Sequence, residues 1–392
     1  MTTTINTINI NKNDLQIEYG DESKTDNYPL YWTAKLQMIV PIKLQGDTKI
    51  SYLLVDTGSG ALAIHIDNNI DSVTNLYEND CNYSQKCGSI NCCNNCLSQP
   101  CEEDPSIKPY ITKGKENLKN KLNLDSDASL NFINECYGSG SWYGFTAESS
   151  FVFVNDVNTN KNSHSLDINF PICSNSMPWT SIDKTINNNY DTTGIIGFFI
   201  GNEKQESTII NYMLHLNYTC FEISMPFNKS ASSHNSLLSG KGKLSFSDDI
   251  SNIKTENLTW IDIPIIVNPF YWSIQKPVKY NIYYTDTNNH SQKINNKIFP
   301  STNSNLIVDS GTNSIYLPLG FSNDLGNITK LELIFNINNK MVTLEIDKAF
   351  GMNLDSEKNI IGSPLWYSYP NIIFNTRKVD NALLGNNISF GK

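Results

Sequence analysis

One short sequence signal occurs twice, once in each half of this 392-residue chain, and this duplication limits the possible folds more than any other feature. An apolar run leads into an acidic turn at residues 54–59 (Leu-Val-Asp-Thr-Gly-Ser) and again at 307–312 (Ile-Val-Asp-Ser-Gly-Thr). Each turn is followed later by two isoleucines and a glycine, at 195–197 and at 360–362. Two unrelated β-turns, with Asp and Ser as common turn formers, would not explain both repeats in the same order. The pattern predicts two related lobes that face each other.

Each repeat places an aspartate, Asp56 or Asp309, at the end of a strand that its apolar residues should bury. The glycine of each turn allows another backbone to approach closely and donates an amide hydrogen bond to the carboxylate. The last hydroxyl residue of each turn is near enough to bond the same carboxylate, and the hydroxyl residue after each aspartate can bond across to the other turn. The predicted supporting residues are Thr57, Gly58, Ser59, Ser310, Gly311 and Thr312.

The rest of the chain is predicted to be mainly β. Apolar residues alternate from Leu30 to Leu44, which indicates a half-buried strand, and Ile50–Asp56 is predicted to return from a turn at Gly46-Asp47. Helical periodicity is best at Glu206–Leu216. Short apolar runs predict further strands at 150–155, 258–267, 305–309, 331–336 and 340–346. Polar stretches at 102–127, 155–165 and 285–296 are predicted to be surface loops.

The nine cysteines are concentrated in the first half. Eight precede residue 200, and their irregular spacing with no nearby histidine favours disulfides over a structural zinc site, although the metal reading stays open. Four bridges would leave Cys220 unpaired and buried. Disulfides indicate an oxidising compartment. The disulfide candidates are Cys81, Cys87, Cys92, Cys93, Cys96, Cys101, Cys136 and Cys173.

Composition narrows the range of partners. The net charge is −10 with no dense Lys/Arg stripe, so a nucleic-acid partner is not expected. No apolar run is long enough for a membrane span, and residues 1–10 have neither the basic start nor the apolar stretch of a secretory signal. Two accounts remain: the protein is cytosolic, or a signal has been trimmed. Because disulfides indicate an oxidising compartment, we expect a trimmed signal and a protein of the secretory pathway, secreted or held in an acidic lysosome- or vacuole-like compartment. Sequons permit glycosylation at Asn82, Asn217, Asn228, Asn257, Asn289, Asn327 and Asn387.

From about residue 31 to residue 390 the chain resembles the pepsin-like aspartic peptidases. The two acidic turns match the family's catalytic turns, and the Ile-Ile-Gly segments match the elements behind them. Residues 137–144 resemble the family's mobile flap, with Tyr137 as its substrate-covering tyrosine beside Gly138 and Ser139. Cys81 and Cys87 resemble a small disulfide loop of the family, and the cysteines up to residue 101 are closer to the insertion of nepenthesin-like members.

The resemblance implies an all-β, bilobal fold with pseudo-two-fold symmetry and a cleft between the lobes. It divides the chain into an N-terminal segment (1–28), a first lobe (29–203) with the cysteine-rich insertion (81–101), and a second lobe (204–392). The implied activity is an aspartic endopeptidase that cleaves polypeptides at acidic pH as a monomer, without a cofactor or metal. The five histidines are scattered and do not support a Ser-His-Asp triad.

Three departures keep a second function in view. Ala63 stands where most relatives carry a tryptophan that anchors the flap tyrosine, a role that Trp142 or Tyr143 could take over. Gly60 and Asn313 stand where serine is common after each turn, and either exchange could weaken the hydrogen-bond network around the two aspartates. The interval from Asp309 to Gly362 is short, so strands or a supporting helix could be missing from it. The alternative is a catalytically silent relative that binds a protein or ligand, and contact between the two carboxyl groups would favour the enzyme instead.

Overall fold

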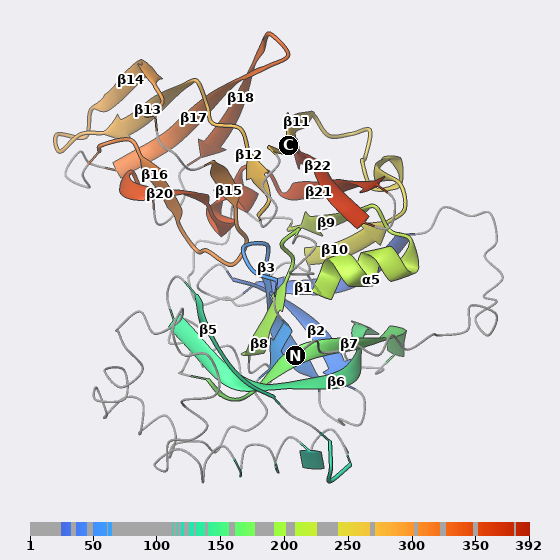
Figure 1. Cartoon of the computed structure of the whole chain (residues 1–392). Helices are drawn as coiled ribbons and strands as arrows, with labels where there is room; N and C mark the ends of the chain where they lie inside the picture. Colours follow the sequence, from blue (N-terminus) through green and yellow to red (C-terminus); the bar gives the residue numbers. More distant parts are fainter. Residues whose placement is uncertain are drawn as a thin grey trace, which may run out of the picture.

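The structure is a computed structural model in which β-strands dominate. It describes residues 25–32, 37–44, 50–60, 62–64, 112, 116, 119–120, 125–128, 131–137, 140–156, 161–176, 192–200, 208–225, 242–266, 271–301, 305–321, 327–347, 352–379 and 382–392. These residues form three sheets and few helices, which confirms the predicted mainly β class. Figure 1 shows strands of the first half (blue to green) in one lobe and most strands of the second half (orange) in another.

The largest sheet runs through both halves of the chain. Within the described residues its main path has the order β11-β22-β21-β9-β10-β1-β2-β3-β8-β4, and β6 attaches β5 and β7 to β2. Its strands are β1 (Thr25–Trp32), β2 (Met38–Leu44), β3 (Ser51–Asp56), β4 (Leu62–Ile64), β5 (Asn131–Tyr137), β6 (Gly140–Asp156), β7 (Lys161–Ser176), β8 (Thr192–Gly197), β9 (Cys220–Ser224), β10 (Gly242–Ser247), β11 (Trp260–Pro264), β21 (Asn371–Val379) and β22 (Ala382–Gly391).

Two smaller sheets make up the other lobe. The five-stranded sheet has the order β12-β15-β20-β16-β19, and the four-stranded sheet has the order β14-β13-β17-β18. Their strands are β12 (Ser273–Ile274), β13 (Lys279–Thr285), β14 (Ser291–Ile298), β15 (Leu306–Val308), β16 (Ile315–Pro318), β17 (Asn327–Ile337), β18 (Lys340–Asp347), β19 (Met352–Asn353) and β20 (Asp355–Ile361). Among the described residues, the helices with defined bounds are α5 (Thr208–Leu216), the predicted one, and two short 3-10 helices, η2 (Ile250–Asn252) and η4 (Ser363–Tyr367).

The predicted strand Leu30–Leu44 is wrong in two ways. The segment contains two antiparallel strands, since Tyr31 of β1 pairs with Ile39 of β2. Strand β2 is also buried at nearly every position, on both faces, where alternation predicted a half-buried strand. Alternation did not reveal the reversal because the apolar period continues unbroken through residues 33–36.

The predicted loop at 285–296 is also wrong. Residues 291–298 form β14, which pairs with β13 beyond a turn at 286–290. Strand β14 lies at the edge of its sheet and exposes nearly every side chain. Its residues are therefore polar at almost every position and lack the polar–apolar alternation by which a strand is recognised. The loop predicted at 155–165 is shorter than expected, since β6 reaches Asp156 and β7 begins at Lys161. The interval between Asp309 and Gly362 forms strands and, within its described residues, no helix.

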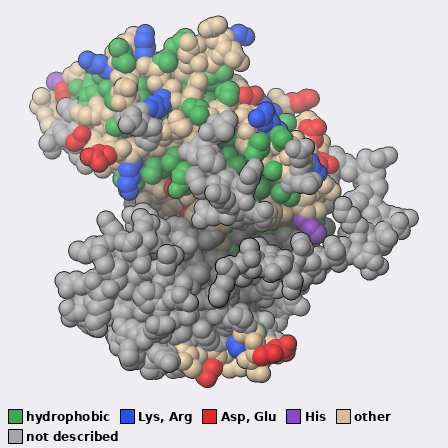
Figure 2. Space-filling view, viewed as in Figure 1, with side chains coloured by type: hydrophobic (Ala, Val, Ile, Leu, Met, Phe, Trp, Pro, Cys, Tyr) green, Lys and Arg blue, Asp and Glu red, His purple; other side chains and the backbone are tan. Residues whose placement is uncertain are grey.

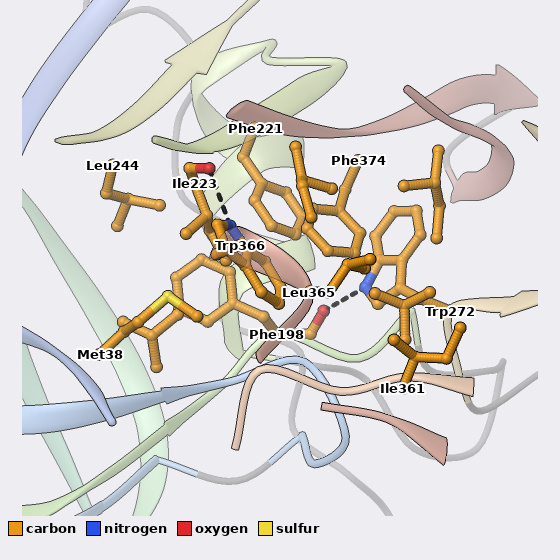
Figure 3. Close-up of a cluster of buried hydrophobic side chains, with 14 of the residues drawn as sticks. Met38, Phe198, Phe221, Ile223, Leu244, Trp272, Ile361, Leu365, Trp366 and Phe374 are labelled. Atoms are coloured by element: carbon orange, nitrogen blue, oxygen red, sulfur yellow. Dashed lines mark hydrogen bonds between the residues drawn. The ribbon is translucent and has the colours of Figure 1, made fainter. Parts of the chain in front are cut away.

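Aromatic side chains fill the core where the lobes meet. Phe221 of β9 stacks on Phe374 of β21 with ring centroids 4.8 Å apart, and Trp272 meets the same Phe374 ring edge-on at 5.0 Å. Trp366 of η4 is fully buried nearby (Figure 3). Phe198 of the first half packs against Phe221 with ring centroids 5.1 Å apart. Each large ring removes roughly 150–250 Å² of apolar surface from water, so this cluster contributes strongly to the union of the two halves.

On the face shown in Figure 2, hydrophobic side chains (green) lie among backbone and other side chains (tan) on the described surface, and lysines and acidic residues are scattered over it. This agrees with the low content of charged residues, 17%. No helix in the described part of the chain has the length and apolar character needed to cross a membrane.

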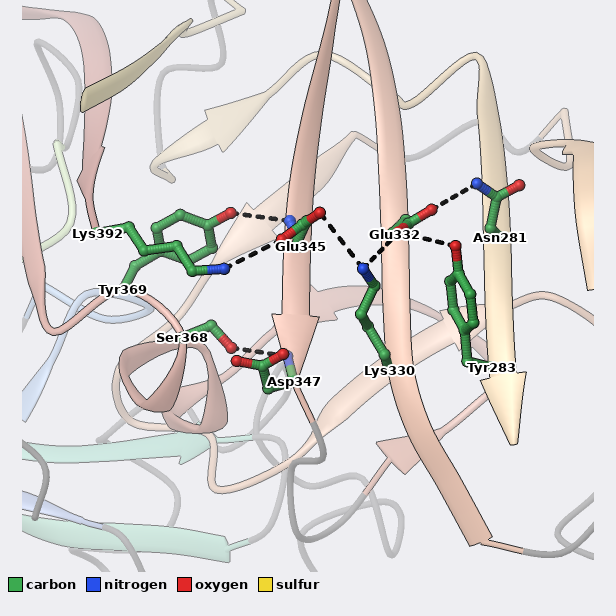
Figure 4. A network of polar contacts seen from close by, with 9 residues as sticks. All are labelled: Asn281, Tyr283, Lys330, Glu332, Glu345, Asp347, Ser368, Tyr369 and Lys392. Carbon is green, nitrogen blue, oxygen red and sulfur yellow. Dashed lines mark hydrogen bonds and ion pairs between the residues drawn. The ribbon is translucent and has the colours of Figure 1, made fainter. Parts of the chain in front are cut away.

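A polar network attaches the four-stranded sheet to the rest of the lobe (Figure 4). Strand β18 is an outer strand, and two of its amides are bonded by side chains: Glu345 N–H donates to the Tyr369 hydroxyl at 2.8 Å, and Asp347 N–H donates to Ser368 Oγ at 2.7 Å. Lys330 reaches both Glu332, at 2.6 Å, and Glu345, at 3.3 Å. The edge amides are therefore satisfied where the sheet meets η4.

We expect Tyr369→Phe to lower the free energy of unfolding by about 1 kcal/mol, because it leaves the Glu345 amide without its acceptor. Tyr280→Phe is a matched control, since Tyr280 is also buried and its hydroxyl makes no hydrogen bond among the described residues. Urea unfolding of both variants measures the difference. Equal losses in the two variants would contradict the role given to the Tyr369 hydroxyl.

Candidate active site

Asp56 lies at the end of a completely buried strand. Strand β3 is buried at every position and lies between antiparallel β2 and parallel β8. The last β3–β8 pair is Asp56 with Gly197, and Phe198 N–H donates to the Asp56 carbonyl at 2.7 Å. This arrangement follows from the apolar run of the first repeat, which forms a strand that can be covered on both faces.

Asp309 lies at the matching place in the second half. It follows β15, which pairs in parallel with β20, and Asp309 N–H donates to the Ile361 carbonyl at 2.9 Å. Beyond each aspartate the chain returns antiparallel to the same neighbour, as β4 beside β8 and as β16 beside β20. The duplication in sequence is therefore a duplication of structure.

The glycine of each Ile-Ile-Gly segment is required by close backbone packing. A Cβ atom on Gly197 would lie 2.4 Å from the Ser59 carbonyl oxygen, and one on Gly362 would lie 2.2 Å from that of Thr312. Any side chain there would push on the backbone of the acidic turn.

Two reciprocal pairs of hydrogen bonds join the acidic turns. The Thr57 hydroxyl donates to the Val308 carbonyl at 2.9 Å, and the Ser310 hydroxyl donates to the Val55 carbonyl at 2.7 Å. Thr57 N–H in turn donates to Ser310 Oγ at 3.1 Å, and Ser310 N–H donates to Thr57 Oγ1 at 2.9 Å. The predicted bonding across the turns is confirmed.

The carboxyl groups lie face to face between these turns. Gly58 N–H donates to Asp56 Oδ1 at 2.8 Å and Gly311 N–H donates to Asp309 Oδ1 at 2.9 Å. A Cβ atom on Gly58 would lie 2.7 Å from the Asp309 carboxyl carbon, so the glycine of one turn makes room for the acid of the other. The Thr312 hydroxyl donates to Asp309 Oδ2 at 2.6 Å.

This environment favours a shared proton. Burial raises the pKa of Asp56 well above its usual value, and both the charge of Asp309 and a hydrogen bond between the two carboxyl groups raise it further. The Gly58 amide and the nearby Ser59 hydroxyl lower this pKa, but their effect is smaller. The predicted bond from Ser59 to the Asp56 carboxylate is not made, because Ser59 Oγ is buried without a hydrogen-bond partner among the described residues. Within the described residues neither aspartate forms a salt bridge with a basic side chain.

The other predicted site residues are placed in part. A hairpin is present at the expected flap, with Tyr137 of β5 paired to Gly140 of β6. Gly138, Ser139 and the six cysteines from Cys81 to Cys101 lie outside the described residues, as do the side chains of Tyr137, Trp142, Tyr143, Cys136 and Cys173. Cys220 is free and buried, as predicted.

Gly60, one of the departures, has a structural explanation. The Phe199 ring lies against it, and a Cβ atom on Gly60 would be 1.3 Å from a ring carbon. The ring therefore takes the space that a serine side chain would need. Ala63 is buried in β4, and Asn313 is exposed after the second turn.

Two residues near the site were not singled out from the sequence, namely Phe198 and Trp272. Phe198 directly follows the first Ile-Ile-Gly segment, which was a usable signal. Trp272 lies far from both turns in the chain, and no periodicity marks it. Among the described residues, no group of three His, Cys, Asp or Glu side chains could hold a metal ion.

The two symmetric acidic turns, with their parallel strands and the sheet shared by both lobes, define a bilobal, pepsin-like β fold. Among solved structures, basic 7S globulin from soybean shares this fold with a TM-score of 0.52 and 11% sequence identity, over 95% of this chain and 97% of that chain. No family model and no curated protein matches the chain. At this identity the likeness is one of fold alone.

The raised pKa of Asp56 predicts how stability changes with pH. Between the unfolded value of 3.8 and the raised folded pKa, the folded protein holds a proton that the unfolded chain has lost, so stability falls as the pH rises through this range. Asp56→Asn removes this penalty and should be more stable than the parent at pH 7, with a difference that closes as the pH falls towards 3.8.

Urea unfolding between pH 3.5 and 7 measures the effect. Asp249→Asn provides the contrast, because hydrogen bonds from the backbone and side chain of Ser251 lower the pKa of Asp249. Asp249→Asn should therefore be less stable than the parent at neutral pH. An Asp56→Asn protein that is less stable than its parent at pH 7 would contradict our account of the buried pair.

Proposed function

We propose that this protein is an aspartic endopeptidase that hydrolyses polypeptides at acidic pH. One observation carries the proposal: Asp56, which is buried, and Asp309, which is half-buried, come from opposite halves of the chain and meet in symmetric turns, where each carboxyl group lies against the glycine of the opposite turn. A purely structural role for two such acids would call for a basic partner, because each buried charge is costly without one.

The chemistry follows from the pair. Two adjacent carboxyl groups do not both ionise readily, so they hold one proton between them over an acidic range that belongs to the pair as a whole. The ionised group takes a proton from a water molecule, and the protonated group donates a hydrogen bond to the scissile carbonyl. The water oxygen attacks the carbonyl carbon, and the pair then returns a proton to the leaving nitrogen. No covalent acyl-enzyme forms.

The hairpin of β5 and β6 is the proposed substrate cover. An extended polypeptide can add to such a hairpin through backbone hydrogen bonds, while Tyr137 and its turn exclude solvent from the reacting bond. We propose a preference for large apolar residues on both sides of that bond. An acid optimum fits an acidic or extracellular compartment, where the proposed disulfides of the first half would also form.

Asp56→Ala and Asp309→Ala should each reduce peptide cleavage near pH 4 by about 10²–10⁴-fold or more, since each removes one partner of the proton transfer. Cleavage of a peptide library by the parent should stop when a statine-type transition-state mimic is added. Mass spectrometry of the products across pH gives both the rate and the preferred residues.

Glu222→Gln is a matched control. Burial raises the pKa of Glu222 as it does that of Asp56, but Glu222 lies in β9 and pairs with Lys243, away from the acidic turns. Replacing the Glu222 carboxylate should leave the rate of peptide cleavage within a few-fold of that of the parent. Cleavage retained by either aspartate variant would refute the proposal. A parent that binds the mimic without cleaving any peptide would favour the silent binding protein that Ala63 suggests.

A further inference from the structure

Trp272 connects the back of one acidic turn to the other. It is completely buried beside β12, and its indole N–H donates to the Phe198 carbonyl at 2.6 Å (Figure 3). Phe198 belongs to the first half of the chain and Trp272 to the second. This bond is therefore a link between the halves that is separate from the Thr57 and Ser310 bonds.

The link is part of a closed ring of hydrogen bonds. Phe198 N–H donates to the Asp56 carbonyl at 2.7 Å, and Val308 N–H donates to the Trp272 carbonyl at 3.0 Å. The Thr57 hydroxyl closes the ring by donating to the Val308 carbonyl at 2.9 Å. The ring includes Asp56 and Thr57 of the first turn and Val308, which precedes Asp309, so a shift at Trp272 is passed to both turns.

Packing holds the indole rigidly. Its ring lies edge-on to Phe221 at 5.5 Å and to Phe374 at 5.0 Å, and both of these rings are fully buried. A donor held in this way cannot rotate to follow a displaced acceptor, because core side chains are close-packed in fixed rotamers.

We propose that Trp272 is a positioning residue which, through its indole N–H and the Phe198 carbonyl, sets the spacing between the Asp56 and Asp309 carboxyl groups. This inference rests on the proposed peptidase function. Adjacent carboxylates repel each other, so the direct bonds between the turns act against a force that opens the pair. A second tether behind the turns limits that opening, and proton transfer through a shared water is sensitive to displacements of about 1 Å.

The main test removes the indole donor at position 272 and retains the ring. Trp272→Phe deletes the N–H, and incorporation of 3-benzothienylalanine at residue 272 replaces it with sulfur at nearly constant shape. Trp366→Phe is the matched control: Trp366 is equally buried and its indole N–H donates to the Ile223 carbonyl at 3.1 Å, outside the ring around the aspartates.

Both changes at residue 272 should reduce kcat by about tenfold to a hundredfold with little change in KM. Wider spacing weakens the effect of Asp309, the charged group among the described residues that raises the pKa of Asp56. The basic limb of the pH–rate profile should therefore move to lower pH by about half a unit. Trp366→Phe should leave the limb where it is. Equal effects in the two Phe variants, or an unchanged kcat with benzothienylalanine, would overturn the proposal.

A second readout does not depend on catalysis. Carbon-13 NMR of aspartate-labelled protein follows the carboxyl titration of the pair directly. The titration should shift to lower pH in both residue-272 proteins and not in Trp366→Phe. If the parent cleaves no peptide but this shift is present, the peptidase proposal fails and the tether stands; if the parent cleaves peptides and no shift occurs, only the tether fails.

Discussion

The reciprocal hydrogen bonds between Thr57 and Ser310 are the interaction on which the site depends. Both side chains are almost completely buried, and each hydroxyl both donates to a carbonyl of the opposite strand and accepts an amide of the opposite turn. A single bond of this kind contributes about 1 kcal/mol, so the set of four offsets part of the repulsion between the two acids. Because water is excluded there, leaving one of these polar groups without a partner would cost more free energy than the hydrogen bond contributes when it forms.

The glycines around the acids explain why the site is symmetric. Gly58 and Gly311 leave room for the carboxyl group of the opposite turn, while Gly197 and Gly362 let the turns rest on the backbone behind them. Each requirement arises twice because the two halves approach each other in the same way. The repeated sequence is thus the direct consequence of a site made by two equivalent surfaces.

This symmetry also explains how much could be predicted. The acidic turns, their supporting hydroxyls and the two Ile-Ile-Gly segments were predicted because each is a local pattern with a local cause. Edge strand β14 was missed because both of its faces meet solvent, which removes the alternation that marks a strand. Trp272 was missed because its contact with Phe198 depends on the packing of distant segments and leaves no periodic trace.

The exchange at Gly60 shows the same limit. From the sequence alone, a glycine in place of serine suggested a weakened network. The structure shows that the Phe199 ring, in the segment that follows β8, fills the volume that a serine side chain at residue 60 would occupy. A departure from a family pattern therefore has to be judged together with the residue that faces it in space.

The acidic groups of the molecule respond to acid in two opposite ways, and this sets the range of pH in which the fold is stable. Burial raises the pKa values of Asp56 and Glu222, so these groups favour folding as the pH falls.

Burial alone would also raise the pKa of Glu332, but hydrogen bonds from Lys330, Asn281 and Tyr283 outweigh it and lower the value. The pKa of Glu345 is lowered chiefly by its bond from Lys392. These two glutamates stabilise the four-stranded sheet above their ordinary pKa of 4.5 and lose that effect as acid protonates them. The proposed reaction needs one proton on the aspartate pair, which requires acid, while the outer sheet needs its glutamates ionised, which limits how much acid the fold can withstand.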